Sequence, residues 1–188
     1  VLKVDDAAIP HKAKVGCIAL GLHDAAAVIA AFESVVANAR RVAGAGSVRA
    51  VVVERQAREG IDLFAGVIRR DGLDPVLVAG LGGVAVEAGL ALGAARLPVD
   101  VPTAQRLLQA AGLDKVVATA GGAAGAAQSA VAQVLERLAE LSIALGPSLR
   151  ALDANPLRVL PSPPLADGSA GPLVIALDAL VELSGEDA

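Results

Sequence analysis

Aromatic residues are almost absent from this chain of 188 residues, which has two Phe and no Tyr or Trp. Proteins that bind RNA or single-stranded DNA stack bases on aromatic side chains, so this composition disfavours those ligands. Basic runs are missing as well: no block of Lys and Arg is longer than two residues, and the net charge is −4. The sequence therefore lacks the electrostatic signature of a protein that binds nucleic acid.

Cysteine and methionine are equally scarce, with one Cys (Cys17) and no Met. A single Cys excludes an intramolecular disulfide and the usual zinc spacings, which fits a reducing cytoplasm. No secretion signal is visible, and Arg, Asp or Gly interrupts every apolar run before it reaches membrane-spanning length. We therefore expect a cytoplasmic protein that does not enter a membrane. Because the chain begins with Val, we also expect further sequence upstream.

What the chain does have is aliphatic: hydrophobic residues make up 55% of it, enough for a sizeable core. Asp24 predicts the start of a helix over 25–42, Thr103 the start of a short helix, and the periodicity of 128–145 a long amphipathic one. Residues 47–56 and 61–70 read as the two strands of a hairpin, and 149–160 as strand, turn, strand. Further strands are expected at 1–4, 16–22, 76–83 and 172–183. This mixture of hairpins and helices predicts an α+β fold.

The sharpest local motif is LDANPL, from residue 152 to residue 157. Asp153 and Asn155 are two apart on an expected strand, so their side chains point to one face. Asp178 lies near the end of a strand able to pair with this one, and three oxygen donors suit a hard cation such as Mg²⁺. The alternative is an Asx-type turn with a surface Asp nearby.

Several other residues point to phosphate chemistry. The segment IPHKAKVG places His11 beside two of the four Lys in the chain. Neutral imidazole attacks phosphorus near pH 7, so His11 is either a phosphate carrier or a solvated loop residue. Lys3 is either a phosphate contact or an ordinary edge lysine. The run AGLGGVAVE (79–87) either cradles phosphate through backbone N–H groups or forms a tight turn.

Taken in order, these segments resemble the ATP-grasp domain of the nucleoside-diphosphate-forming acyl-CoA synthetases. That family includes ADP-forming acetyl-CoA synthetase and is more distantly similar to the succinyl-CoA synthetase β subunit. The resemblance implies an ATP-grasp fold, with 1–46 as the remainder of an N-terminally truncated first lobe and 47–188 as a complete second lobe. The matching segments are VLKV…IPHKAKVG, VVVERQAREGIDLFAGVIRRDGLDPVLVAGLGGVAVE, ARLPVD and LDANPLRV…VIALDA.

The resemblance also implies roles for residues that would bind the nucleotide. It directs Lys3 and Arg69 toward the phosphates. It puts Glu54 where the chain passes the adenine in the hinge between the lobes. Asp62 takes the place of a usual Glu in the same group of nucleotide-binding residues.

For the reaction itself, the resemblance implies one metal site and one relay residue. Asp153, Asn155 and Asp178 match the Mg²⁺-binding cluster of the family. His11 is similar to the histidine that relays phosphate on the nucleotide side. The implied cofactors are Mg²⁺ and ATP or ADP.

The implied protein is an acid–CoA ligase that converts acyl-CoA, ADP and phosphate into acid, CoA and ATP. Its partner would be a CoA-binding domain or subunit, within an oligomer in the intact enzyme. We expect the isolated chain to be inactive, because part of the first lobe is lacking.

Several departures from the family keep a second hypothesis open. Lys14 stands where an acid is usual, Cys17 where a Gly is usual, and Ala151 where a Glu is usual. ATAGGA also replaces an expected Gly-Arg-Gly segment. The second hypothesis is a catalytically inactive ATP-grasp-like regulatory domain, for example of a protein acetyltransferase.

Overall fold

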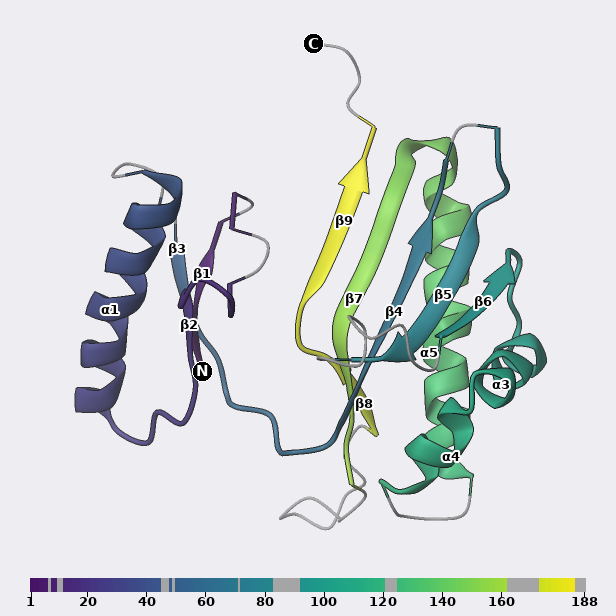
Figure 1. Cartoon of the computed structure of the whole chain (residues 1–188), viewed down its shortest axis with the longest axis horizontal. Helices are drawn as coiled ribbons and strands as arrows, with labels where there is room; N and C mark the ends of the chain where they lie inside the picture. The colour runs from purple at the N-terminus through teal and green to yellow at the C-terminus, as the bar shows by residue number, and fades with distance from the viewer. Residues whose placement is uncertain are drawn as a thin grey trace. The chain divides into compact units, whose positions relative to one another are not determined.

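The computed structural model describes residues 1–6, 8–9, 12–44, 48, 50–70, 72–82, 92–120, 125–161 and 173–184. The chain divides into two compact units, Val1–Ala57 and Arg58–Ala188, each built on a sheet (Figure 1). The division falls later than the predicted boundary after residue 46, because the strand in between pairs within the sheet of the first unit. The identification of these units with the two ATP-grasp lobes stays a prediction.

The first unit is an antiparallel sheet covered by one helix. Strand β1 lies in the middle and pairs with β2 and β3 on its two sides. Helix α1 packs against β1. The bounds are β1 (Leu2–Asp5), β2 (Ile18–Ala19), α1 (Ala25–Ala43) and β3 (Ala50–Val53).

The ends of α1 agree with the prediction. The Asp24 carboxylate accepts a hydrogen bond of 2.7 Å from the Ala27 N–H, which satisfies one of the free donors of the first turn. Gly44 ends the helix with φ 95°, a conformation that glycine adopts without strain. Cys17 is fully buried under this helix, and burial raises the pKa of its thiol. Cys17 is therefore a residue of the core.

The second unit is a larger antiparallel sheet with helices on one face. The order of its described strands is β6-β5-β4-β7-β8, with β9 also paired to β7. The strands are β4 (Ile61–Ile68), β5 (Val76–Leu81), β6 (Leu92–Arg96), β7 (Leu149–Val159), β8 (Val174–Ala176) and β9 (Ala179–Leu183). The helices are α3 (Val101–Ala110), α4 (Leu113–Ala118) and α5 (Ala126–Leu145), followed by the 3-10 turn η1 (Gly146–Ser148).

Alternation along β4 shows where the core of this unit lies. Leu63, Ala65 and Val67 are each 1% exposed and pack in one cluster with residues of α3, α4 and α5. Asp62 and Phe64 point to the other side, because successive side chains of a strand alternate between faces. We call this second side the open face; helices α3, α4 and α5 of the same unit pack on the opposite one (Figure 1).

Two strand predictions were wrong in their pairing. Residues 47–56 and 61–70 do not form a hairpin, since β3 pairs with β1 whereas β4 pairs with β5 and β7. Residues 149–160 do not turn, since β7 is one continuous strand of 11 residues. Its register against β4 slips between Leu63 and Ala65, which leaves an irregularity at Asn155 and Pro156. Proline is tolerated at such a bulge because it needs no ladder hydrogen bond there.

Other differences concern helix ends and the last strand. Asp100, and not Thr103, caps α3: its carboxylate accepts from the Thr103 N–H at 2.9 Å. The expected strand over 172–183 is two strands, β8 and β9, with Asp178 just before the second. The apolar period over 128–145 includes Leu141 and Ile143, but these side chains of α5 are 44% and 52% exposed. None of the described helices has both the length and the hydropathy that a membrane crossing requires.

Candidate functional site

Two of the predicted nucleotide-binding residues lie together in the first unit. Lys3 is on the central strand β1, and Glu54 directly follows β3, which pairs with it. The Lys3 ammonium lies 3.0 Å from Glu54 Oε2, and the Lys3 side chain is only 16% exposed. Strand pairing thus brings together two charges that are 51 positions apart in the sequence.

Asp62, another predicted nucleotide-binding residue, forms a two-pronged ion pair that sequence reasoning missed. Arg158 of β7 lies directly opposite Asp62 of β4 in the sheet register. Its Nε donates to Oδ1 at 2.6 Å and its Nη2 to Oδ2 at 2.8 Å. The hydrogen bond to Asp62 raises the pKa of the Arg158 guanidinium. Arg158 is the second Arg of β7, after Arg150, and no local pattern names its partner, so the sheet register was needed to find Asp62.

Two glycines hold the backbone close to this pair. A Cβ on Gly60 would collide with the Val159 carbonyl oxygen and would lie 3.0 Å from Arg158 Cγ. A Cβ on Gly82 would lie 3.0 Å from the Asp62 carbonyl oxygen, and the Gly82 N–H donates to that oxygen at 2.8 Å. The contact at Gly60 excludes a side chain, and the contact at Gly82 is tight, so the segments before β4 and after β5 lie directly against the pair.

Arg69 lies just beyond the end of β4. Its N–H donates to the Arg150 carbonyl at 3.1 Å, which fixes its backbone against β7. The Arg69 Nε is buried and has no hydrogen-bond partner among the described residues. A buried guanidinium N–H without an acceptor is costly, so this position suits an acceptor supplied by a ligand or by water.

The predicted metal ligands lie on β7 and directly before β9, the strand that pairs with β7. The Asn155 N–H donates to the Asp178 carbonyl at 3.0 Å, and Asp153 is two residues away, opposite Leu180 of β9. Two carboxylates and one amide are oxygen donors of the kind that Mg²⁺ prefers. No group of three or more His, Cys, Asp or Glu arranged for a metal occurs in the described part of the chain. Asp153 and Asp178 are only two acidic residues, so the proposed metal site needs the Asn155 amide as its third oxygen donor. The metal site stays a prediction.

Other predicted features fall outside the described residues. They are His11, residues 83–91, which include most of the glycine-rich run, and residues 121–123 of the ATAGGA segment. Of the two Lys beside His11, Lys14 is exposed and Lys12 is half-buried. The structure therefore tests neither the relay role of His11 nor the phosphate role of the glycines.

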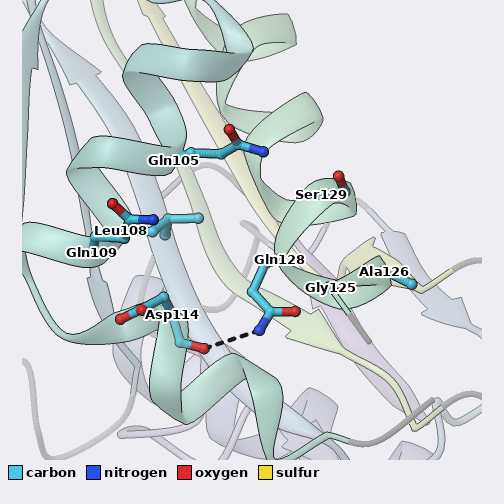
Figure 2. A pocket seen from close by; sticks show the side chains of 8 residues that line it. All are labelled: Gln105, Leu108, Gln109, Asp114, Gly125, Ala126, Gln128 and Ser129. Atoms are coloured by element: carbon cyan, nitrogen blue, oxygen red, sulfur yellow. Dashed lines mark hydrogen bonds between the residues drawn. The ribbon is translucent and has the colours of Figure 1, made fainter. Parts of the chain in front are cut away.

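A hollow of about 520 Å³ lies elsewhere, in the helical layer of the second unit. Figure 2 shows it between α3, the start of α4 and the start of α5, with the Gln128 amide donating to the Asp114 carbonyl at 3.4 Å. None of the predicted nucleotide or metal residues lines it. Its lining residues are Gln105, Leu108, Gln109, Asp114, Gly125, Ala126, Gln128 and Ser129.

Comparison with curated proteins finds ADP-forming CoA ligases. The chain is 24% identical over 157 residues to the β subunit of acetate–CoA ligase (ADP-forming) I of Pyrococcus furiosus, covering 84% of this chain and 67% of that protein. It is 24% identical over 160 residues to 4-hydroxybutyrate–CoA ligase (ADP-forming) of Nitrosopumilus maritimus, covering 85% of this chain. It spans only 23% of that second relative.

Solved structures share the fold. Acetyl-coenzyme A synthetase 1 of Ca. Korarchaeum cryptofilum, in complex with coenzyme A and Ca-AMPCP, matches 97% of this chain with a TM-score of 0.78 and 22% identity, over 75% of its own length. Another structure of that protein holds coenzyme A and Mg-AMPPCP, with a phosphohistidine segment pointing towards the nucleotide-binding site. It matches 98% of this chain and 76% of its own length, with a TM-score of 0.68 and 21% identity.

The match to a family model decides the classification. The model of the ATP-grasp domain matches residues 1–183, nearly the whole chain. The α+β architecture and the solved structures agree with this match and confirm the predicted fold class. The chain is therefore a member of the ATP-grasp domain family, related to the ADP-forming acyl-CoA synthetases.

Proposed function

We propose that this chain is the nucleotide-binding part of a nucleoside-diphosphate-forming acyl-CoA synthetase. The reaction converts acyl-CoA, ADP and phosphate into acid, CoA and ATP. The observation that carries the proposal is the family match over residues 1–183, joined to relatives that are themselves ADP-forming CoA ligases. CoA binding is assigned to a partner domain or subunit, and the intact enzyme to the cytoplasm as an oligomer.

Four residues are assigned to the nucleotide. Lys3 and Arg69 supply positive charge for the phosphates, because phosphoryl transfer depends on positioning and on neutralising charge. Two observations support these roles: Lys3 is partly buried, and the Nε of Arg69 has no partner within the described part of the chain. Glu54 and Asp62 are acceptors for the donor groups of the nucleoside, and each has a cation in contact that keeps its carboxylate in place.

Asp153, Asn155 and Asp178 are assigned to Mg²⁺. The pairing of β7 with β9 and the all-oxygen donor set support this assignment. The ion, when bound, would neutralise charge on the transferring phosphoryl group. The protein side of the site supplies a carboxylate and an amide from β7, and a second carboxylate from Asp178, directly before β9.

His11 is assigned to the phosphoryl relay. An imidazole nitrogen of His11 forms a bond to phosphorus as the bond from phosphorus to the donor group on the partner breaks. A terminal phosphate oxygen of ADP then attacks the same phosphorus, the N–P bond breaks, and ATP leaves with neutral His11 restored. Lys12 and Lys14 offset the charge of the phosphohistidine.

The test uses the complete gene product, with His11→Ala compared against wild type. We expect phosphoryl transfer from acyl phosphate to ADP to be abolished, while ADP binding measured by calorimetry is largely kept. His23→Ala is the matched control, because His23 is exposed and precedes the cap of α1, so it should leave transfer unchanged.

Each outcome decides something. Normal turnover by the His11→Ala protein would remove His11 from the mechanism. A wild-type protein that binds ADP but transfers no phosphate would favour the inactive regulatory domain. A wild-type protein that binds no adenine nucleotide would overturn the proposed function altogether.

A further inference from the structure

Arg158 is a charged residue on the open face for which neither the sequence motifs nor the proposed function supplies a role. It is bound to Asp62, a residue assigned to the nucleotide, so an inference about Arg158 rests on the proposed function. Both side chains are half-buried, with 22% of Arg158 and 33% of Asp62 exposed. Asp62 thus remains within reach of a ligand, whereas most of Arg158 lies beneath the surface.

The geometry of the pair fixes the Asp62 carboxylate. A guanidinium is a planar fork, and here two of its N–H groups meet the two carboxylate oxygens at 2.6 and 2.8 Å. A carboxylate offers about four lone-pair sites and only accepts hydrogen bonds. Two of these sites are taken by Arg158, which leaves one on each oxygen, at opposite flanks of the group.

The surrounding backbone allows the pair little room to move. A Cβ on Gly60 would lie 3.0 Å from Arg158 Cγ, and a Cβ on Gly82 would lie 3.0 Å from the Asp62 carbonyl oxygen, so the backbone at both glycines lies close against the pair. Arg158 Nη1 also lies 3.4 Å from the Arg58 carbonyl oxygen. A lysine at position 158 would keep the positive charge but lose the fork, since its ammonium is a point charge on a flexible stem.

The chemistry of a held carboxylate selects one part of a nucleotide. It repels the phosphates and accepts only from donors, which in ADP are the ribose hydroxyls and the adenine amino group. A hydroxyl rotates to direct its hydrogen at a single fixed lone pair, whereas the amino group requires an acceptor in the plane of the base. We propose that Arg158 is a positioning residue that holds Asp62 so that one free lone pair of its carboxylate accepts a ribose hydroxyl of the bound nucleotide.

The experiment pairs protein variants with nucleotide variants in the complete gene product. Calorimetry measures the binding of ADP, 2′-deoxy-ADP and 3′-deoxy-ADP to wild type, Arg158→Gln, Arg158→Lys and Asp62→Asn, with thermal melting run in parallel. For wild type we expect removal of one of the two hydroxyls to weaken binding about tenfold, as for a hydrogen bond to a charged group. In Arg158→Gln and Asp62→Asn that penalty should fall to about twofold or less. In Arg158→Lys the penalty for the missing hydroxyl should lie between these two values, because lysine keeps the positive charge but lacks the planar fork of the guanidinium.

A matched control separates positioning from a general effect of losing an ion pair. Arg137 and Glu140 form a comparable pair at 2.7 Å on α5, in the helical layer, with both side chains mainly exposed. Arg137→Gln should keep the wild-type penalty for the missing hydroxyl. A merely structural role for Arg158 would lower the melting temperature of Arg158→Gln but leave the hydroxyl penalty intact in the folded protein.

The results that overturn the inference differ from those that overturn the proposed function. Binding of ADP by wild type with no penalty at either hydroxyl, or with the same penalty in Arg158→Gln, removes the positioning role and leaves the function standing. Absence of ADP binding by wild type removes the function and this inference with it. If Arg158→Gln does not fold, Arg158→Lys decides, because a full tenfold penalty in that variant refutes a role for the fork.

Discussion

Replacing Gly66 by Ala should disturb both the sheet of the second unit and the predicted metal site. Gly66 lies in β4, opposite Asp153 of β7. A Cβ at this position would lie 2.6 Å from the Leu152 carbonyl oxygen and 3.6 Å from Asp153 Oδ1. The nearest atom belongs to the backbone, so no side-chain rotation relieves the contact.

The size of the effect follows from that distance. Ordinary contacts of a Cβ begin at 3.4 Å, so the Leu152 carbonyl would have to move by about 0.8 Å relative to β4. Overpacking of this kind costs about 1–3 kcal/mol. For a chain of this size, a cost of about 2 kcal/mol lowers the melting temperature by roughly 4–8 °C. The same shift moves Asp153, and a displacement of about 1 Å at a site can cost about a hundredfold in activity.

The assay combines melting by calorimetry with Mg²⁺ titration of ADP binding in the complete gene product. Gly112→Ala is the control: Gly112 has φ +69° and open space around its Cβ position, so it tests backbone strain without a steric clash. We expect Gly112→Ala to lower the melting temperature modestly and to leave the Mg²⁺ dependence unchanged. Gly66→Ala should lower the melting temperature and weaken the Mg²⁺ dependence at least tenfold.

Two results would contradict this reasoning. A Gly66→Ala protein that melts like wild type would mean that β4 and β7 are not packed as closely as the structure shows. A protein that melts lower but responds normally to Mg²⁺ would keep the packing argument and remove Asp153 from the metal site.

Two further substitutions test the packing of α5 and the cap of α3. Ser142 is fully buried in α5 and its hydroxyl has no partner among the described residues, so Ser142→Ala should stabilise the protein by about 1 kcal/mol. Ser129→Ala in the same helix is the control and should stabilise the protein less. A lower melting temperature for Ser142→Ala would contradict the prediction, because it would mean that the Ser142 hydroxyl makes a hydrogen bond. Asp100→Ala should lower the melting temperature at pH 7, because hydrogen bonds from Thr103 lower the pKa of Asp100. The extra stability of wild type over Asp100→Ala is fully present above the unfolded-state pKa of about 3.9, and it is lost as the pH falls through the lower folded-state pKa of Asp100. A difference in melting temperature that stays constant into strong acid would refute this explanation. Asp100→Asn should keep most of the stability without this pH dependence, since Asn is also a good cap.

Local signals in the sequence predicted the elements that depend on neighbouring residues. Asp24 and Gly44 mark the ends of α1, and the structure places a capping hydrogen bond and a positive φ at these positions. The apolar period of 128–145 predicted α5 to within two residues. Such signals act over about one helical turn, so they can be read without knowing the rest of the fold. The prediction that Thr103 caps α3 missed by three residues, because Asp and Thr both cap helices and the sequence alone ranks them poorly.

The candidate site was predicted by motif order and completed by the sheet. The segments around Lys3, Asp62 and Asp153 carried the family resemblance, and the family match bears it out. The order of the motifs does not predict which side chains of these segments contact one another. Lys3 meets Glu54 and Asp62 meets Arg158 only because particular strands pair in a particular register.

The order of motifs along the chain was enough to predict the family, and composition and short-range hydrogen bonding were enough to predict the α+β class, the aliphatic core and the positions of most strands and helices. Only the tertiary structure decided that β3 joins β1 instead of β4, and that Arg158 lies across from Asp62, 96 positions away. It also decided that Gly60 and Gly66 must lack a side chain. Strand pairing and close backbone approach depend on the burial of the whole sheet, and a one-residue shift in register would send every side chain to the other face.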